Sequence, residues 1–444
     1  MSKEELIAKA RKPGQDAMRL HRFYQGKMET ALKCCVRDFD DFAIWYSPGV
    51  AEPCRAIHGN RKEVFRYTNK SNFVAVVSDG SRVLGLGDIG PWAAMPVMEG
   101  KAMLFKYLGG VDAFPICLDT KDPEEIIRTV KYLQPTFGGI NLEDFASPKC
   151  FYILDRLREE MNIPVWHDDQ QGTAAVTLAA LINALRVVNK KIEEVKITLV
   201  GAGAANICIA RLIMLAGVRP ENLLVVDSQG ILHKGRTELQ KEFKEKWELC
   251  LSTNPENKTG GVVEALVGAD VLISLSKSGP GIIKKDWIAA MNKDAIVFVC
   301  ANPVPEIWPW KAREAGARIV CTGRSDFPNQ VNNSLVFPGI FRGALDVHAR
   351  TISDEMCIAA AYELANTARD RGLDAENLLP TMDDWKVVPR IARAVAVKAM
   401  EQKFARIELS EEDIYDRAKK IIKRSRNQTE YMMEKGLIPL PEEE

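Results

Sequence analysis

Short apolar runs alternate with longer amphipathic stretches over most of the chain. The first series comprises VAVV (74–77), VDAFPICL (111–118), GGINL (138–142) and IPVW (163–166), and helical patterns separate these runs. After an Ala-rich helical stretch from Gly172 to about Asn189, the rhythm restarts at KITLV, LLVVD, ADVLISL, AIVFVC and ARIVC. Such alternation is typical of parallel strands with helices on the faces of the sheet. We therefore predict an α/β protein with two parallel-sheet domains, the second of them Rossmann-like.

Both ends of the chain have helical patterns without strands. Residues 2 to about 35 predict a polar helical arm with no core of its own, which we expect to pack on another domain or subunit. Beyond Asp346 the strand signals stop and three helical stretches follow. We therefore expect an amino-terminal domain over 1–160 that includes the arm 1–35, a Rossmann-like domain over 161–385, and a helical carboxy-terminal extension over 386–444.

Length and composition exclude several classes of protein. The 444 residues are enough for two or three domains. The 60 basic and 60 acidic residues cancel, and no basic block suggests nucleic acid as a partner. Ten cysteines lie without pair spacing, which favours reduced thiols in a cytoplasm, with an organelle matrix as the alternative. With no run of about 18 apolar residues, we predict no membrane partner.

Two acidic pairs beside apolar runs suggest a metal site. Glu143 and Asp144 precede Phe145, and Asp168 and Asp169 follow Trp166. Carboxylates next to apolar strands are costly unless a cation compensates for their lost hydration. Ligands that are all oxygen favour Mg²⁺ or Mn²⁺ over zinc. The alternative is that Asp144 and Asp169 cap the helices that begin after them.

Two glycine motifs compete for a dinucleotide. The complete GxGxxG spans 85–90, but we expect Pro96 to break the helix that must follow it. The degenerate loop GAGAAN (201–206) lies between the strand-like KITLV and a proline-free helical pattern, and the next strand ends in Asp227. We therefore assign the dinucleotide to the second loop, against the alternative of a plain turn. The predicted contacts are Gly201, Gly203, Ala204, Ala205, Asn206, Asp227, Ser228 and Asn302.

A series of motifs resembles the malic enzymes. The segments YSPGVAEPCRAI, DGSRVLGLGDIG, VMEGKAMLFK, NLEDFASP, HDDQQGTAAV, LVGAGAAN, VVDSQG, HKGR, ANPVPE and FPNQVNNSLVFPGIFRGALD occur in the order expected of that family. The resemblance runs from about Trp45 to His348, and the chain looks like the compact microbial form. It implies oxidative decarboxylation of L-malate to pyruvate and CO₂ with reduction of NAD or NADP, dependent on Mg²⁺ or Mn²⁺. It also implies a homodimer or a dimer of dimers.

The resemblance also implies roles for single residues. Lys101 matches the family's base, Asp168 the carboxylate that supports this lysine, and Tyr46 the acid that protonates the enol of pyruvate. A solvated lysine is protonated at neutral pH, so Lys101 needs burial or a nearby cation to act as a base. The residues that match the family's metal ligands are Glu143, Asp144 and Asp169. Those that match its substrate contacts are Arg82, Asn302 and Asn333.

The preferred cofactor is predicted to be NAD. Asp227 stands where a carboxylate binds the ribose 2′-hydroxyl and repels a 2′-phosphate. Against this, Lys234, Arg236 and Lys241 lie close enough in sequence for one of them to reach a phosphate.

Three other functions remain compatible with parts of this pattern. A malolactic enzyme would use nearly the same residues and return its NAD unchanged. An oxaloacetate decarboxylase would need metal and base without redox turnover. A nucleotide-sensing protein without catalysis is disfavoured, because it would not need Tyr46, Lys101 and all four acidic positions together.

Overall fold

A parallel sheet of four strands forms the centre of the amino-terminal domain. The computed structural model describes residues 3–441. The strands lie in the order β2-β1-β3-β4. Their bounds are β1 (Phe73–Ser78), β2 (Asp112–Cys117), β3 (Gly139–Leu142) and β4 (Val165–His167). β1 and β3 are buried along almost their whole length, which explains their continuous apolar runs. The prediction of a parallel sheet over 74–166 is confirmed.

The second sheet has six strands in the order β10-β9-β8-β5-β6-β7. They are β5 (Ile197–Val200), β6 (Leu223–Asp227), β7 (Gly230–Ile231), β8 (Val271–Ser274), β9 (Ala295–Val299) and β10 (Ala317–Thr322). All pair in parallel except the short β7, which is antiparallel to β6. The strand order reverses at β5, because the chain continues to β6 on one side and to β8 on the other. Open α/β sheets bind nucleotides at this point, so the sheet has the predicted Rossmann-like arrangement.

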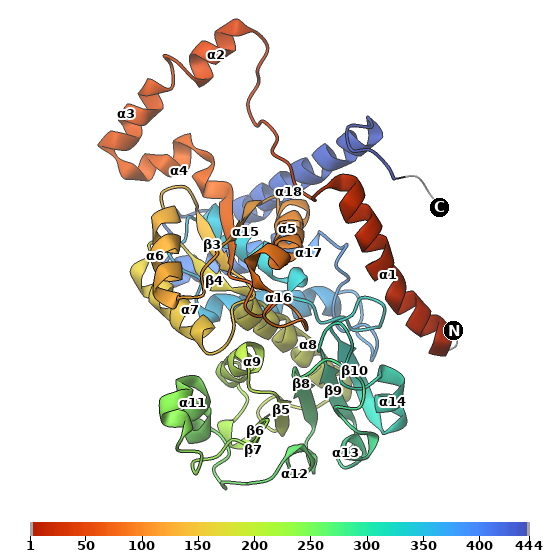
Figure 1. Cartoon of the computed structure of the whole chain (residues 1–444). Coiled ribbons are helices and arrows are strands. Elements are labelled where there is room, and N and C mark those ends of the chain that lie inside the picture. The colour runs from red at the N-terminus through yellow and green to blue at the C-terminus, as the bar shows by residue number, and fades with distance from the viewer. Residues whose placement is uncertain (1–2, 442–444) are drawn as a thin grey trace.

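Helices cover the faces of both sheets. Around the first sheet lie α5 (Gly90–Gly109), α6 (Pro123–Leu133) and α7 (Lys149–Glu160). Those of the second domain are α8 (Thr173–Val188), α9 (Ala204–Leu215), α10 (Leu239–Glu242), α11 (Lys244–Ser252), α12 (Val262–Leu266), α13 (Lys285–Ala289) and α14 (Pro309–Glu314). Figure 1 shows the two sheets one above the other, with α8 and α9 between them.

One helical segment is apolar enough to raise the question of a membrane. By length and composition, Asp168–Val188 passes as a span, but 78% of the window tested is buried inside the protein. The segment consists of the π-helical turn η3 (Asp168–Gly172) and α8, which packs on α9 and α16 (Asp354–Arg369). Its apolar character is therefore that of a central core helix joining the two domains.

The amino-terminal arm is helical over less of its length than predicted. α1 spans Lys3–Tyr24, and Ser2, where the predicted helix begins, lies outside the described residues. Residues 25–38 follow without helix or strand. The shorter helices α2 (Phe39–Trp45), α3 (Ala51–Gly59) and α4 (Val64–Tyr67) then lead to β1. Figure 1 shows α2 and α3 standing off from the body of the protein.

Pro96 does not interrupt α5, so the prediction of a break at this residue is wrong. The helix runs from Gly90 to Gly109 with Pro96 inside it. A proline removes one backbone donor and crowds the carbonyl four residues earlier, which here belongs to Trp92 in the first turn. Packing on β2, α15 (Phe337–Asp346) and α18 (Glu411–Glu434) stabilises the rest of the helix. α5 is therefore one continuous helix that packs on β1 and β2.

The carboxy-terminal helices return to the amino-terminal domain. They are α15, α16, α17 (Val387–Glu401) and α18, so the predicted helical region beyond Asp346 is confirmed. α17 packs on α15 and α16, and α18 packs on α17 and α5. The segment predicted as an extension thus packs through α18 on α5, a helix of the amino-terminal domain. The boundaries at 160/161 and 385/386 stay predictions.

Candidate active site

Lys101 lies buried between two carboxylates where α5 meets the carboxyl ends of β3 and β4. Its side chain is 8% exposed, and its Nζ is 2.5 Å from Oδ2 of Asp168 and 3.0 Å from Oε1 of Glu143. The ring of Phe337 lies on another side of the ammonium, with its centroid 4.4 Å from Nζ. The structure therefore brings together the predicted base and the predicted supporting carboxylate.

A second cluster of carboxylates adjoins this lysine. Glu143, Asp144 and Asp169 each offer an oxygen within 4.8 Å of the others. Asp144 has φ +59°, and its backbone N–H donates to Oδ2 of Asp169 at 2.8 Å. Its own Oδ2 is buried without a hydrogen-bond partner. Three such oxygens and one unpaired acceptor fit a hard divalent cation.

The pKa values of these groups follow from burial and mutual repulsion. Burial raises the pKa of Glu143, Asp168 and Asp169, although the charge of Lys101 opposes it. Burial and the charge of Asp169 raise the pKa of Asp144 to about 8. Burial lowers the pKa of Lys101, but Asp168 and Glu143 outweigh it and raise this pKa above its usual value. One ammonium among four carboxylates, of which Asp169 alone is partly exposed, leaves an excess of negative charge that a cation would balance.

Helix capping does not account for the acidic pairs. α7, the first helix after Asp144, begins at Lys149 and has no side-chain hydrogen bond at its cap. α8, the helix after Asp169, likewise has no such bond at its cap, Gly172. The two carboxylates face each other across the site instead. The geometry therefore favours the metal interpretation over capping.

The predicted substrate contacts come from three separate segments. Arg82 follows β1, and its backbone N–H donates to the carbonyl of Asp144 at 2.9 Å. Asn302 approaches the same loop, because a Cβ on Gly85 would lie 2.5 Å from the Asn302 carbonyl oxygen. The Cβ of Asn333 would lie 3.2 Å from a Cβ built on Gly172, in the turn that begins with Asp168. Asn302 thus lies beside the loop that contains Arg82, and Asn333 lies beside the turn that begins with Asp168, although 251 positions separate Arg82 from Asn333 in sequence.

The loop assigned to the dinucleotide has the expected strand–turn–helix geometry. Gly201 has φ +97°, and a Cβ there would lie 2.5 Å from the carbonyl oxygen of Leu275. Gly203 precedes the first residue of α9, so the helix amino terminus faces the turn. The side chain of Asn206 donates to the carbonyls of Val200 and Gly201, at 2.9 and 2.8 Å. Asparagine in place of a third small residue therefore ties the helix to the strand.

Comparisons with known proteins agree with this arrangement. Residues 25–124 and 120–158 match the family description "Malic enzyme, N-terminal domain", and residues 170–312 and 316–403 match "Malic enzyme, NAD binding domain". The chain belongs to the malic enzyme family. The bifunctional malic/malolactic enzyme of Bacillus subtilis is 50% identical over 407 residues, which cover 92% of this chain and 98% of that protein.

Two further relatives extend the comparison. The NAD-dependent malic enzyme of Geobacillus stearothermophilus is 51% identical over 381 residues, which cover 86% of this chain and 78% of that one. The crystal structure of the Entamoeba histolytica malic enzyme superposes with a TM-score of 0.97 at 48% identity, covering 99% of this chain and 93% of that one. The predicted family, the compact form and the NAD(P)-linked decarboxylation of malate are thereby confirmed.

Tyr46 is the one predicted catalytic residue of this malic enzyme that lies apart from the others. It follows the last residue of α2 and is 76% exposed. Figure 1 shows α2 well separated from α5, which carries Lys101. A single copy of the chain therefore does not place the tyrosine beside the lysine.

Two supporting residues escaped the sequence analysis. Asp79 is fully buried after β1, and it accepts hydrogen bonds from the backbone and hydroxyl of Ser81 and pairs with Lys149. Glu306 is also fully buried; it accepts bonds from the backbone N–H groups of Ser276 and Ala301. Both acids lie inside the motifs quoted above, Asp79 directly after β1 and Glu306 in the loop that follows β9. Their place inside motifs that follow strands was the signal in the sequence that could have identified these two residues.

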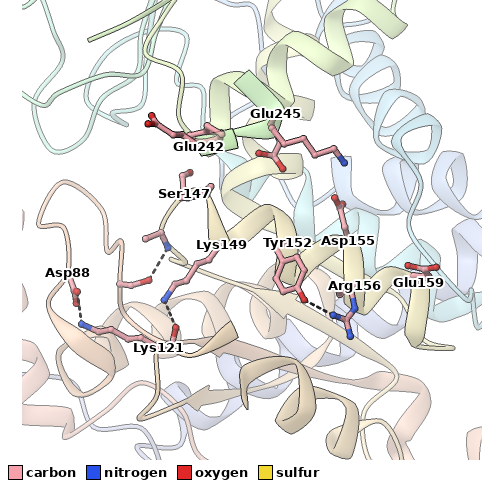
Figure 2. A pocket seen from close by; sticks show the side chains of 15 residues that line it. Asp88, Lys121, Ser147, Lys149, Tyr152, Asp155, Arg156, Glu159, Glu242 and Glu245 are labelled. Carbon is pink, nitrogen blue, oxygen red and sulfur yellow. Dashed lines mark hydrogen bonds and ion pairs between the residues drawn. The ribbon is translucent and has the colours of Figure 1, made fainter. Parts of the chain in front are cut away.

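A cavity of about 690 Å³ lies between the two domains, beside the segment Ala146–Lys149 that follows Glu143 and Asp144. Figure 2 shows Lys149, Tyr152 and Arg156 of α7 facing Glu242 and Glu245 of the second domain across it. The cavity thus opens where the domain with the acidic cluster faces the domain with the dinucleotide loop.

Proposed function

We propose that this malic enzyme converts L-malate to pyruvate and CO₂ while reducing NAD or NADP, with Mg²⁺ or Mn²⁺ held by Glu143, Asp144 and Asp169. The observation that carries the proposal is the buried Lys101 between Asp168 and Glu143, beside an acidic cluster with an unpaired acceptor. A bound metal ion would polarise the C2 oxygen and stabilise the enolate left by CO₂, and the nicotinamide would accept the C2 hydride.

The residues around the lysine have distinct tasks in this proposal. Asp168 and Glu143 raise the pKa of Lys101, so the lysine must first lose a proton, which a divalent cation bound by the neighbouring carboxylates would favour. Neutral Lys101 then takes the proton of the malate C2 hydroxyl, and Asp168, 2.5 Å away, orients the amine and stabilises the ammonium that forms. Phe337 keeps water from one side of Nζ. Arg82, Asn302 and Asn333 bind the carboxylates of malate, which need cationic or amide donors.

For the cofactor contacts and the cellular location we keep the predictions made from the sequence. The proposed contacts are Gly201, Gly203, Ala204, Ala205, Asn206, Asp227, Ser228 and Asn302, with NAD preferred because Asp227 carries a negative charge at the end of β6. We place the enzyme in the cytoplasm, where its ten free cysteines would stay reduced.

The identity of the acid product distinguishes malic from malolactic activity. With L-malate, Mn²⁺ and NAD, we expect one NADH and one pyruvate for each malate consumed. The measurement combines absorbance at the nicotinamide band with chromatography of the acids, and NADP in place of NAD gives the second arm. Lactate formed without net NADH would favour the malolactic alternative, and decarboxylation confined to added oxaloacetate would favour a decarboxylase.

We further propose that the enzyme works as a homodimer, or as a dimer of dimers, in which Tyr46 enters the active site of the other copy. Large apolar side chains of α2 are exposed, among them Phe39 (83%) and Trp45. Apolar residues flanking the site are exposed too, namely Trp92 and Met95 on α5 and Leu86 on the preceding loop. Contiguous exposed apolar surface is typical of an interface. A second copy would bury both surfaces and bring the tyrosine to the lysine.

Mixing two inactive variants tests this arrangement. Tyr46→Phe and Lys101→Ala are each expected to lose malate decarboxylation. If the site is shared, a mixed dimer contains one site with both residues intact, so random mixing should restore about a quarter of the wild-type activity. The assay uses differently tagged chains that are unfolded, mixed and refolded together. An active monomer in sedimentation, or mixed dimers without activity, would contradict the shared site.

A further inference from the structure

Glu306 is a fully buried carboxylate that joins the segments following β8 and β9. Its Oε1 accepts hydrogen bonds from Oγ of Ser274 at 2.8 Å and from the backbone N–H of Ser276 at 3.1 Å. Its Oε2 accepts a hydrogen bond from the backbone N–H of Ala301 at 3.2 Å. A single side chain therefore fixes the spacing of two loops at the same edge of the second sheet.

The hydrogen bonds indicate that Glu306 is ionised. All three groups that contact its oxygens are donors, whereas a protonated carboxyl group would itself need an acceptor. Burial raises the pKa of Glu306, and the bonds from Ser276, Ser274 and Ala301 oppose that rise. The three donors are neutral, so within residues 3–441 no ion pair compensates the charge of this carboxylate.

The segment that follows β8 adjoins the turn assigned to the dinucleotide. A Cβ on Gly201 would lie 2.5 Å from the carbonyl oxygen of Leu275 and 3.3 Å from Cα of Ser276. Oγ of Ser276 is buried and has no hydrogen-bond partner among the described residues. A buried polar atom without a partner is rare in a folded protein, so this hydroxyl fits a site where a bound group supplies the missing bond.

The strand order places the nicotinamide half of the cofactor on the side of β8 and β9. In a Rossmann-like sheet the dinucleotide lies across the point where the strand order reverses, with its adenosine ribose at the acid that ends the second strand. Asp227 is that acid here, so the other nucleotide extends from β5 towards β8 and β9. Asn302, a proposed contact of both cofactor and substrate, directly follows Ala301.

We propose that Glu306 favours the oxidised cofactor over the reduced one, by holding a negative charge beneath the segments that face the nicotinamide half. The inference rests on the proposed function, through the placement of the dinucleotide at Gly201. The nicotinamide ring is positively charged in NAD⁺ and neutral in NADH, so a nearby carboxylate attracts only the oxidised ring. Glu306 is a positioning residue, because it acts through its charge and through Ser276 and Ala301. Weaker binding of NADH than of NAD⁺ would assist release of the reduced product.

The affinities of the two redox forms test this role without turnover. The full chain is titrated with NADH, followed by its fluorescence, and with NAD⁺, followed by calorimetry, with Mn²⁺ present and malate absent. Glu306→Gln keeps the shape of the side chain and removes its charge, so the affinity for NAD⁺ relative to NADH should fall by about three- to thirtyfold. Glu306→Asp keeps the charge on a shorter side chain, so it should weaken both forms and leave their ratio within about twofold of wild type.

Glu314→Gln is the matched control. Glu314 lies on α14 of the same domain, pairs with Lys285 at 2.8 Å and is 53% exposed, so solvent screens its charge and both affinities should match wild type. The inference is wrong if Glu306→Gln changes neither affinity, or if it weakens NAD⁺ and NADH by the same factor, which would leave Glu306 a structural role only. Should Glu306→Gln fail to fold, a ratio that falls in Glu306→Asp, where the charge is intact, would also contradict it.

Failure of the inference differs from failure of the proposed function. A wild-type protein that binds neither NAD⁺ nor NADH would overturn the placement of the cofactor together with the role of Glu306. A wild-type protein that binds both forms but does not oxidise malate would overturn the proposed function alone, and the ratio of the two affinities would still decide the role of Glu306.

Discussion

Replacing Lys101 by alanine is expected to lower kcat for malate oxidation by roughly 10²- to 10⁴-fold, the loss typical of a missing acid or base. The malate hydroxyl would have no other amine to take its proton, because the residues nearest Nζ are Asp168, Glu143 and Phe337. The measurement is steady-state NADH formation with saturating Mn²⁺. A small primary amine added to the variant should restore part of the rate, since it can occupy the vacated space and accept the proton.

Lys101→Arg separates the role of charge from the role of proton transfer. The guanidinium keeps a positive charge beside the carboxylates but does not lose its proton in the accessible pH range. We expect this variant to fold and yet to be as inactive as Lys101→Ala. If it retained more than about a tenth of the activity, Lys101 would act as a charge that positions Asp168, and another group would be the base.

Apolar patterning was sufficient to predict the strands, because buried parallel strands leave little freedom in composition. The runs at 74–77 and 163–166, for example, both became strands of the first sheet. The failure at Pro96 has a different origin. Local preference predicts a break there, but packing on β2, α15 and α18 outweighs it. A pattern of single residues contains no information about which distant elements will pack on a helix.

At the candidate site, too, the sequence predicted some of the contacts and not others. The motifs paired Lys101 with Asp168, and the structure brings the two side chains into contact, with Nζ 2.5 Å from Oδ2. Motif order could not place Tyr46, because residues 25–38 are irregular and do not fix where the following helices lie. It also could not show that Lys246 of α11 pairs with Asp227 at the end of β6, a contact that spans 19 positions. Long-range contacts of this kind follow from tertiary packing.

Asp169→Asn is expected to abolish metal-dependent turnover while leaving dinucleotide binding intact. The amide keeps the shape of the side chain but loses the charge that a divalent cation requires. Titration with Mn²⁺ measures the lost affinity, and NADH fluorescence reports cofactor binding. Asp88→Asn serves as control, because this exposed carboxylate pairs with Lys121 and lies outside the acidic cluster.

Thermal unfolding of the same variant separates a metal ligand from a structural residue. Glu143 and Asp144 are buried and Asp169 is partly exposed, and loss of hydration raises the pKa of each above its usual value. Without metal, removing one of these charges relieves repulsion, so Asp169→Asn should melt no lower than the wild-type protein. Added Mn²⁺ should raise the melting temperature of the wild type alone, because only a state that binds the ion is stabilised by it. A variant that melts well below wild type while keeping its Mn²⁺ affinity would assign Asp169 a structural role, and the metal would have to be held elsewhere.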